Sequence, residues 1–147
     1  MTSINEISPA SVSVGSERKV FPLSKVTRAV GVMLEKQAGS KLIWVRAEIS
    51  QRSFKGNNAY LDLVEERDGD KLAQLRGTIW GGTLDAIRKT LGNEFDEVLK
   101  PGQEIVFSAR MAFHAVYGFS LNIQSIDLAA MLGEMERRRK ATLEALR

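Results

Sequence analysis

The sequence predicts a small, mainly β domain with flanking helices. Apolar and polar residues alternate over five separate stretches between residues 43 and 128, which is the period of half-buried strands. Turns that contain glycine join the first stretch to the second, the second to the third and the fourth to the fifth, as in antiparallel hairpins. A stripe of apolar residues with a period near 3.6 precedes them, and good helix formers fill the end of the chain.

Composition narrows the class of protein. The chain has 147 residues, of which 44% are hydrophobic, enough for one domain with a real core plus extensions. No apolar run approaches the roughly 18 residues needed to cross a bilayer, and Met1–Ser16 lacks the pattern of a secretion signal, so we expect no membrane association. Cysteine is absent, which excludes disulfides and suits a reducing, cytoplasmic location.

The helical segments lie at the two ends and in the middle. We expect residues 1–20, which are rich in serine, to be a flexible lead-in. A first helix should begin at Ser24 as its N-cap and stop at Gly39, with its apolar stripe packed on the domain. Thr83–Leu91 should form a second helix, and residues 131–147 a third whose apolar stripe is broken by the basic run 136–140.

Five strands lie between and after these helices. They are predicted at Ile43–Ser50, Ala59–Glu65, Ala73–Trp80, Glu104–His114 and Phe119–Leu128. A helix between the third and fourth of five antiparallel strands is the arrangement of the OB fold, a five-stranded Greek-key barrel. We therefore predict an OB-fold barrel over residues 21–130 together with the first helix. OB folds commonly bind oligonucleotides or oligosaccharides on strands 2 and 3, but the fold alone does not establish that function.

Aromatic and basic residues alternate on the predicted outer face. Single-stranded nucleic acid needs aromatic planes for its bases and cations for its phosphates. The candidate binding residues are Arg46, Arg52, Phe54, Lys55, Tyr60, Arg76, Trp80 and Tyr117. Each aromatic alone is more simply explained by packing in the core or at an edge, and Arg46 by an ion pair with Glu48. Taken together, these residues support a nucleic-acid-binding surface more strongly than any one of them does.

No catalytic site is predicted, and no cofactor or metal. The single histidine, His114, cannot build a histidine metal site, and no candidate nucleophile has a base beside it in the sequence. The "DGDK" stretch lacks the further carboxylates of a calcium loop. Glu94, Asp96 and Glu97 are best read as a solvated loop. Residues 41–130 hold eleven basic and twelve acidic residues, so binding to phosphates alone would be weak.

The order of several short motifs resembles one known family. "PLSKVTRAV", "WVRAEIS", "YLDL", "AQLRGTIW", "KPGQEIVFSARMAFH", "YGFSLNIQSID" and "LGEMERRR" together resemble the N-terminal part of the exodeoxyribonuclease VII large subunit, over residues 21–147. The resemblance implies an OB-fold domain that binds single-stranded DNA for a nuclease domain beyond this chain. It also implies that small subunits bind to regions absent here, and that this chain alone does not cut DNA.

Two positions depart from the family pattern. Asn58-Ala59 stands where the family often has a basic or aromatic pair, and Gly81 follows Trp80 where an arginine is frequent. The positions that the resemblance carries over are Arg46, Tyr60, Arg76 and Trp80, with Phe54 as a looser match. Two hypotheses follow. The chain is a module that binds single-stranded DNA, or it is an OB-fold assembly module with little DNA binding of its own.

Overall fold

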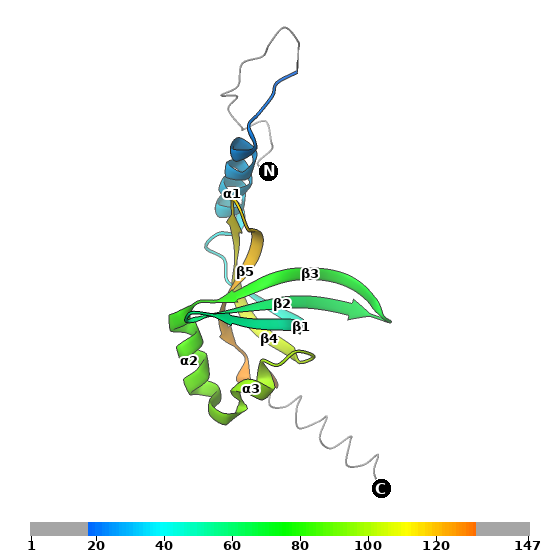
Figure 1. The fold of residues 1–147 in the computed structure, drawn as a ribbon, viewed down its shortest axis with the longest axis vertical. Coiled ribbons are helices and arrows are strands. Elements are labelled where there is room, and N and C mark those ends of the chain that lie inside the picture. The colour runs from blue at the N-terminus through cyan, green and yellow to red at the C-terminus, as the bar shows by residue number, and fades with distance from the viewer. Residues whose placement is uncertain (1–17, 132–147) are drawn as a thin grey trace.

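The computed structural model describes residues 18–131, so most of the expected lead-in 1–20 and nearly all of the expected helix 131–147 lie outside the described residues. Five strands form a closed barrel in the order β1-β2-β3-β5-β4 (Figure 1). The strands are β1 (Ile43–Lys55), β2 (Asn58–Arg67), β3 (Asp70–Ile79), β4 (Glu104–His114) and β5 (Gly118–Ile126). The predicted five-stranded barrel with flanking helices is confirmed.

Strand β1 pairs with two other strands. Its first half, Ile43–Glu48, pairs with β4, and its second half pairs with β2. The two halves meet at Glu48, and a bulge between Ile49 and Gln51 interrupts the pairing with β2; such a bulge bends the strand and increases its twist. The sequence predicted only the first eight residues, because the bulge ends the strict alternation at Ile49.

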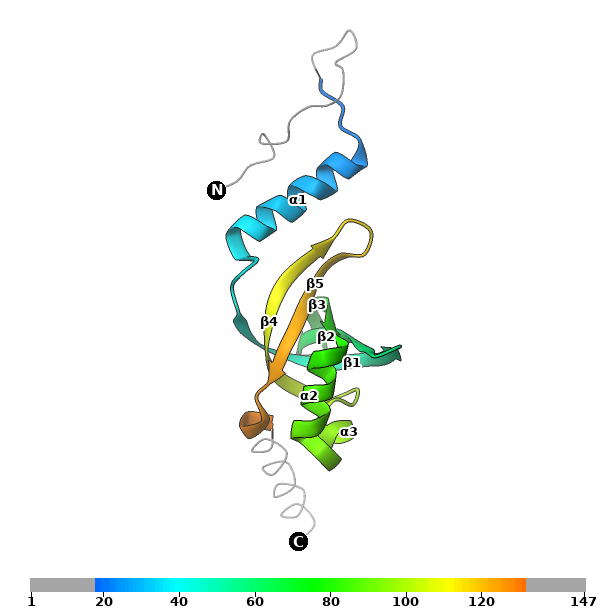
Figure 2. The same ribbon diagram turned by 90° about the vertical axis from the view of Figure 1, so that its left-hand side faces the viewer.

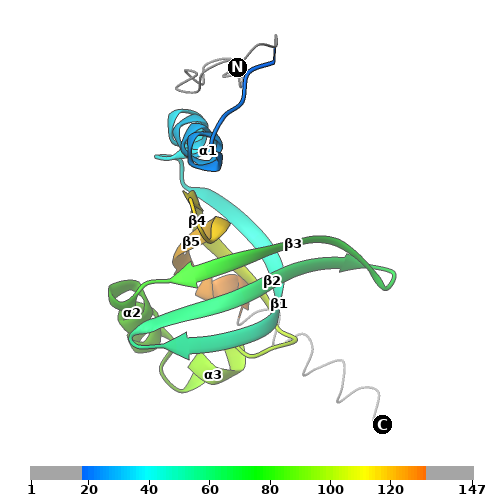
Figure 3. The same ribbon diagram turned by 45° about the horizontal axis from the view of Figure 1, so that its top comes forward.

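Helices after β3 cover one end of the barrel. They are α2 (Gly81–Leu91), the 3-10 turn η2 (Gly92–Glu94) and α3 (Phe95–Val98) (Figure 3). Leu84, Ile87 and Leu91 on α2, with Phe95 and Val98 on α3, are buried in the same core as Phe107 of β4. The predicted loop at Glu94–Glu97 is therefore wrong: its carboxylates are exposed, but the segment is a helical turn anchored by Phe95 and Val98.

The first helix, α1 (Leu23–Ala38), lies outside the barrel. It contacts β4 and runs beside the far end of the β4–β5 hairpin (Figure 2). It has no buried residue, and Leu23 is 77% exposed, so its stripe is only partly covered. Gly39 caps its C-terminus as expected. Ser24 is not the N-cap, because the helix begins at Leu23 and Pro22 is its N-cap, two residues earlier than predicted.

The β2–β3 hairpin extends beyond the barrel as a two-stranded ribbon, residues 65–75 (Figure 1). Because β5 pairs with β3 only from Arg76 to Thr78, the outer half of β3 has one unpaired edge. Leu72 and Leu75 are exposed there. Four acidic and two basic residues lie within residues 65–71.

Candidate nucleic-acid interface

Two rows of side chains cross the outer face of β1, β2 and β3. Directly opposite residues of antiparallel strands project from the same face. Asp62 lies between Gln51 and Arg76 in the first row. Tyr60 lies between Ser53 and Thr78 in the second. Thr78 is buried, because Tyr60 and Asn122 flank it on the neighbouring strands. These rows form what we call the β1–β3 face.

An aromatic pair stands at the end of this face. The rings of Tyr60 and Trp80 meet edge to face, with centroids 6.5 Å apart. Trp80 remains 48% exposed, although a tryptophan in a small barrel could have been buried. The guanidinium of Arg76 lies 5.9 Å from the centre of the Tyr60 ring, within the range of a cation–π contact. Two aromatic planes and a cation are thus brought together as predicted.

The hydrogen bond between Asn58 and Gly81 holds Trp80 at the end of β3. The backbone N–H of Gly81 donates to Oδ1 of Asn58 at 2.9 Å. A Cβ at position 81 would come within 3.1 Å of the Asn57 side chain and 3.3 Å of its carbonyl oxygen. The two departures from the family pattern are therefore coupled, since Asn58 supplies the acceptor and Gly81 allows the close approach.

Arg52 and Phe54 point away from the β1–β3 face. The bulge shifts the alternation, so these two side chains face α3 and not the side that carries Arg46. Arg52 donates to the carbonyl oxygen of Leu99 at 3.2 Å and its side chain is only 22% exposed. Phe54 stacks on Phe95 at 6.4 Å between centroids. The expected exposure of Arg52 is wrong, and the extra residue of the bulge is the reason.

Arg88 is a basic residue that the sequence analysis did not select. Its guanidinium lies 4.4 Å from the ring centre of Phe95 and 5.3 Å from that of Phe54. It therefore brings an exposed positive charge from α2 to the edge of β1. No feature of the sequence could have identified Arg88, because from the sequence it is an ordinary residue on the exposed side of a helix. Its contact with Phe54 depends on the folded arrangement of β1 and α2.

The remaining basic candidates lie at separate places. Arg46 is on the part of β1 that pairs with β4, and its Nη1 contacts Glu104 Oε1 at 2.9 Å, not Glu48 as expected. Lys55 is exposed at the turn that joins β1 to β2. Arg46 is thus partly neutralised and away from the aromatic pair, whereas Lys55 is near the end of the strand that carries Ser53.

Tyr117 lies at the tip of the β4–β5 hairpin and is 83% exposed. It stacks on His114 at 4.6 Å, and the backbone N–H groups of Val116 and Tyr117 both donate to His114 Nδ1. Because β5 runs parallel to β3, this tip lies beyond the end of β5 that adjoins Arg76, whereas Trp80 follows the other end of β3. The structure does not join Tyr117 to the aromatic pair.

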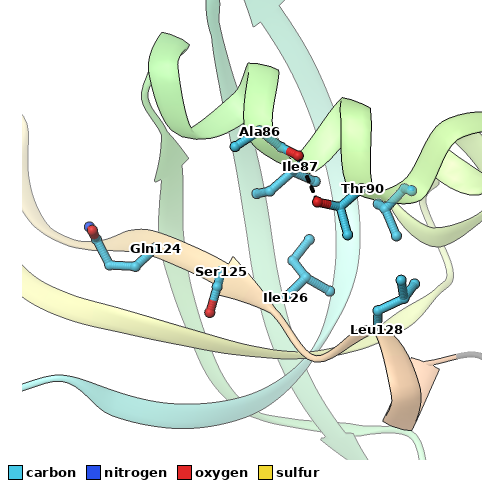
Figure 4. A pocket seen from close by; sticks show the side chains of 8 residues that line it. Ala86, Ile87, Thr90, Gln124, Ser125, Ile126 and Leu128 are labelled. Atoms are coloured by element: carbon cyan, nitrogen blue, oxygen red, sulfur yellow. Dashed lines mark hydrogen bonds between the residues drawn. The ribbon is translucent and has the colours of Figure 1, made fainter.

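A hollow of about 90 Å³ opens on the β1–β3 face. Gln51, Arg52, Ser53, Tyr60, Asp62 and Arg76 line it, although the guanidinium of Arg52 is directed to Leu99. A larger hollow of about 200 Å³ lies between α2 and β5 (Figure 4). No charged side chain lines that second hollow, and Thr90 there donates its hydroxyl to the Ala86 carbonyl. Of these two hollows, the one on the β1–β3 face combines donors, acceptors and an aromatic ring.

Residues 18–131 give no evidence of a metal site, since no three histidine, cysteine or acidic side chains gather there. In the same part of the chain, no helix is long and apolar enough to span a membrane.

Comparison with known proteins assigns the chain to a family. The model of a family described as "OB-fold nucleic acid binding domain" matches residues 21–127, which include every strand of the barrel. The chain belongs to this family. Within OB-fold domains, strands 2 and 3 form the usual ligand face, which corresponds here to the position of Tyr60, Asp62 and Arg76.

Two solved structures are similar to this OB-fold domain at low identity. One is the crystal structure of the S. pombe Stn1-Ten1 complex, at 15% identity and a TM-score of 0.43, covering 71% of this chain and 74% of the other. The other is the crystal structure of the p204 HINb domain, at 14% identity and a TM-score of 0.41, covering 76% and 52% respectively. No curated protein sequence matches the chain significantly.

Proposed function

We propose that this OB-fold domain binds single-stranded DNA on its β1–β3 face, as the DNA-presenting module of an exodeoxyribonuclease VII large subunit. The nuclease domain and the sites for the small subunits would then lie in other parts of that protein. The motif resemblance supports the parent protein, and the family match supports nucleic acid as the ligand class.

The observation that carries the proposal is the exposed aromatic pair. Tyr60 and Trp80 offer ring surfaces at the end of β3, and Arg76 lies over the Tyr60 ring. Bases of single strands are unpaired and stack on such rings, whereas bases of a duplex are stacked on one another. Selectivity for single strands follows from this geometry.

Phosphates would lie along the edge of the face where exposed cations occur. Lys55 stands at the β1–β2 turn, and Arg88 reaches the same edge from α2. Arg76 is more central and 58% exposed at its side chain, with Asp62 as a distant partner at 3.8 Å. Three cations are few for a phosphate-binding surface, so stacking must supply much of the affinity.

The ribbon formed by the β2–β3 hairpin favours assembly as a second candidate function. Its net charge is negative over residues 65–71, which disfavours phosphate, while Leu72 and Leu75 are exposed beside an unpaired strand edge. Such an edge is suited to pairing with another chain. DNA contact would then be incidental.

A matched pair of tryptophan variants tests the proposal. Trp80→Ala and Tyr60→Ala should each weaken binding of a fluorescent dT12 about tenfold, because one stacked base contributes about 1–3 kcal/mol. Trp44→Ala is the control, since Trp44 is also exposed, at 60%, but lies on the part of β1 that pairs with β4. Fluorescence anisotropy, with unlabelled duplex as competitor, measures the affinity.

Equal effects of Trp44→Ala and Trp80→Ala would show that the β1–β3 face has no special role. No binding of dT12 by the unmodified chain at low salt, together with concentration-dependent association in sedimentation, would favour the assembly function instead.

A further inference from the structure

The centre of the β1–β3 face holds a carboxylate, Asp62, where a surface for phosphates should avoid one. A negative charge there repels the DNA backbone unless it is neutralised or binds a donor of the ligand. Its neighbour Arg76 approaches only to 3.8 Å, and both side chains are partly exposed, so this ion pair is weak and opens at little cost.

The carboxylate of Asp62 can also accept further hydrogen bonds. Its side chain is 30% exposed, and within residues 18–131 no donor lies at hydrogen-bond distance of its carboxylate oxygens. By contrast, the Glu104 carboxylate accepts from Arg46 at 2.9 Å. A half-buried carboxylate without a donor is unfavourable, and a ligand that supplies N–H groups relieves this cost.

We infer that the hollow around Asp62 is a base-reading subsite that prefers guanine in single-stranded DNA. The inference rests on the proposed function. Guanine is the one DNA base whose Watson–Crick edge presents two adjacent donors, N1–H and N2–H, which match the two oxygens of a carboxylate. Adenine and cytosine place a lone-pair nitrogen beside their amino group, and that nitrogen is repelled by Asp62.

The rest of the hollow fits this orientation. Gln51 stands opposite Asp62 on β1 and Arg76 stands opposite it on β3, so either can donate to guanine O6 when the carboxylate binds N1–H and N2–H. Tyr60 lines the same hollow and supplies an aromatic surface next to the base. At about 90 Å³ the hollow admits the edge of a base while its plane remains outside.

Oligonucleotides with altered bases test this on the unmodified chain. Anisotropy in lithium chloride, which suppresses guanine quadruplexes, compares d(TG)6 with d(TA)6, with the inosine version that lacks N2–H, and with the 7-deazaguanine version that lacks N7. We expect d(TG)6 and its 7-deaza version to bind about fivefold tighter than d(TA)6, with inosine between them. Loss of the preference with 7-deazaguanine would overturn the role of Asp62, because an arginine on the N7 edge would then be the reader.

A variant pair assigns the preference to Asp62. Asp62→Asn should reduce the d(TG)6 to d(TA)6 ratio below about twofold, because an amide offers only one acceptor oxygen to N1–H and N2–H. Asp68→Asn makes the same charge change at the hairpin tip and should keep the ratio. If all oligonucleotides bind equally, the guanine subsite is refuted while the proposed function stands. If none binds, the proposed function fails and the subsite with it.

Discussion

Asn58 illustrates how one side chain can position a functional residue without touching a ligand. Its Oδ1 accepts the Gly81 N–H, and this bond joins the start of β2 to the junction where Trp80 leaves β3. From the sequence alone, Asn58 was interpreted only as standing where the resembled family often has a basic or aromatic residue that could touch DNA. The hydrogen bond could not be predicted, because its two partners are 23 residues apart and meet through the β2–β3 pairing.

Asn58→Ala should lower the free energy of unfolding by about 1–2 kcal/mol, since it leaves the partly buried Gly81 N–H without its acceptor. Urea denaturation followed by tryptophan fluorescence measures this loss. Asn93→Ala, at an exposed position of η2, is the control and should change stability by less than about 0.5 kcal/mol. A neutral Asn58→Ala would mean that the Trp80 junction is held by backbone pairing alone.

At the scale of elements, alternation predicted the strands well and their ends poorly. Strand β4 was found at its observed bounds, Glu104–His114, because alternation and the preceding turn agree there. The second half of β1 was missed because a bulge breaks the alternation. Helix α3 was missed because four residues are too few to show a 3.6-residue period. Of the candidate site, Tyr60, Arg76 and Trp80 were predicted to share a face, and the bulge moved Arg52 off it.

Helix α3 is anchored by Val98 and by Phe95, which is 5% exposed and contacts both Phe54 and Arg88. Phe95→Ala should therefore destabilise the chain by about 3–5 kcal/mol. Phe54→Ala should cost clearly less, because Phe54 is 41% exposed. Thermal unfolding of both variants checks the order. Equal losses would show that the two rings act as one unit and not as a core residue with a cover.

For the whole molecule, charge is unevenly distributed over a nearly neutral barrel. Residues 18–41 hold six basic residues and one acidic residue, whereas the ribbon at 65–71 has an acidic excess. Arg76 lies on the β1–β3 face, and Lys55 and Arg88 lie at its edge. Counting charges in the sequence predicted a barrel without a large basic excess, but it could not show that Arg88 of α2 lies beside Phe54 of β1.

Binding of dT12 should therefore weaken only modestly with salt. Three phosphate contacts predict a slope of about −2 in log K against log salt concentration. Arg88→Ala should make the slope shallower by about 0.7, while Arg46→Ala should leave it unchanged because Arg46 is paired with Glu104 off the face. A slope steeper than about −4 would indicate further cationic contacts, for instance along α1.

The divided pairing of β1 has a consequence for how the chain acquires its structure. The first half of β1 pairs with β4, which lies roughly sixty residues later in the sequence. Closure of the barrel therefore depends on contacts between distant parts of the chain and should be slow, in the millisecond to second range. During synthesis at about 5–20 residues per second, the Ile43–Glu48 edge would stay open for several seconds after it emerges. The nascent chain is therefore most exposed to wrong pairing just before β4 is made.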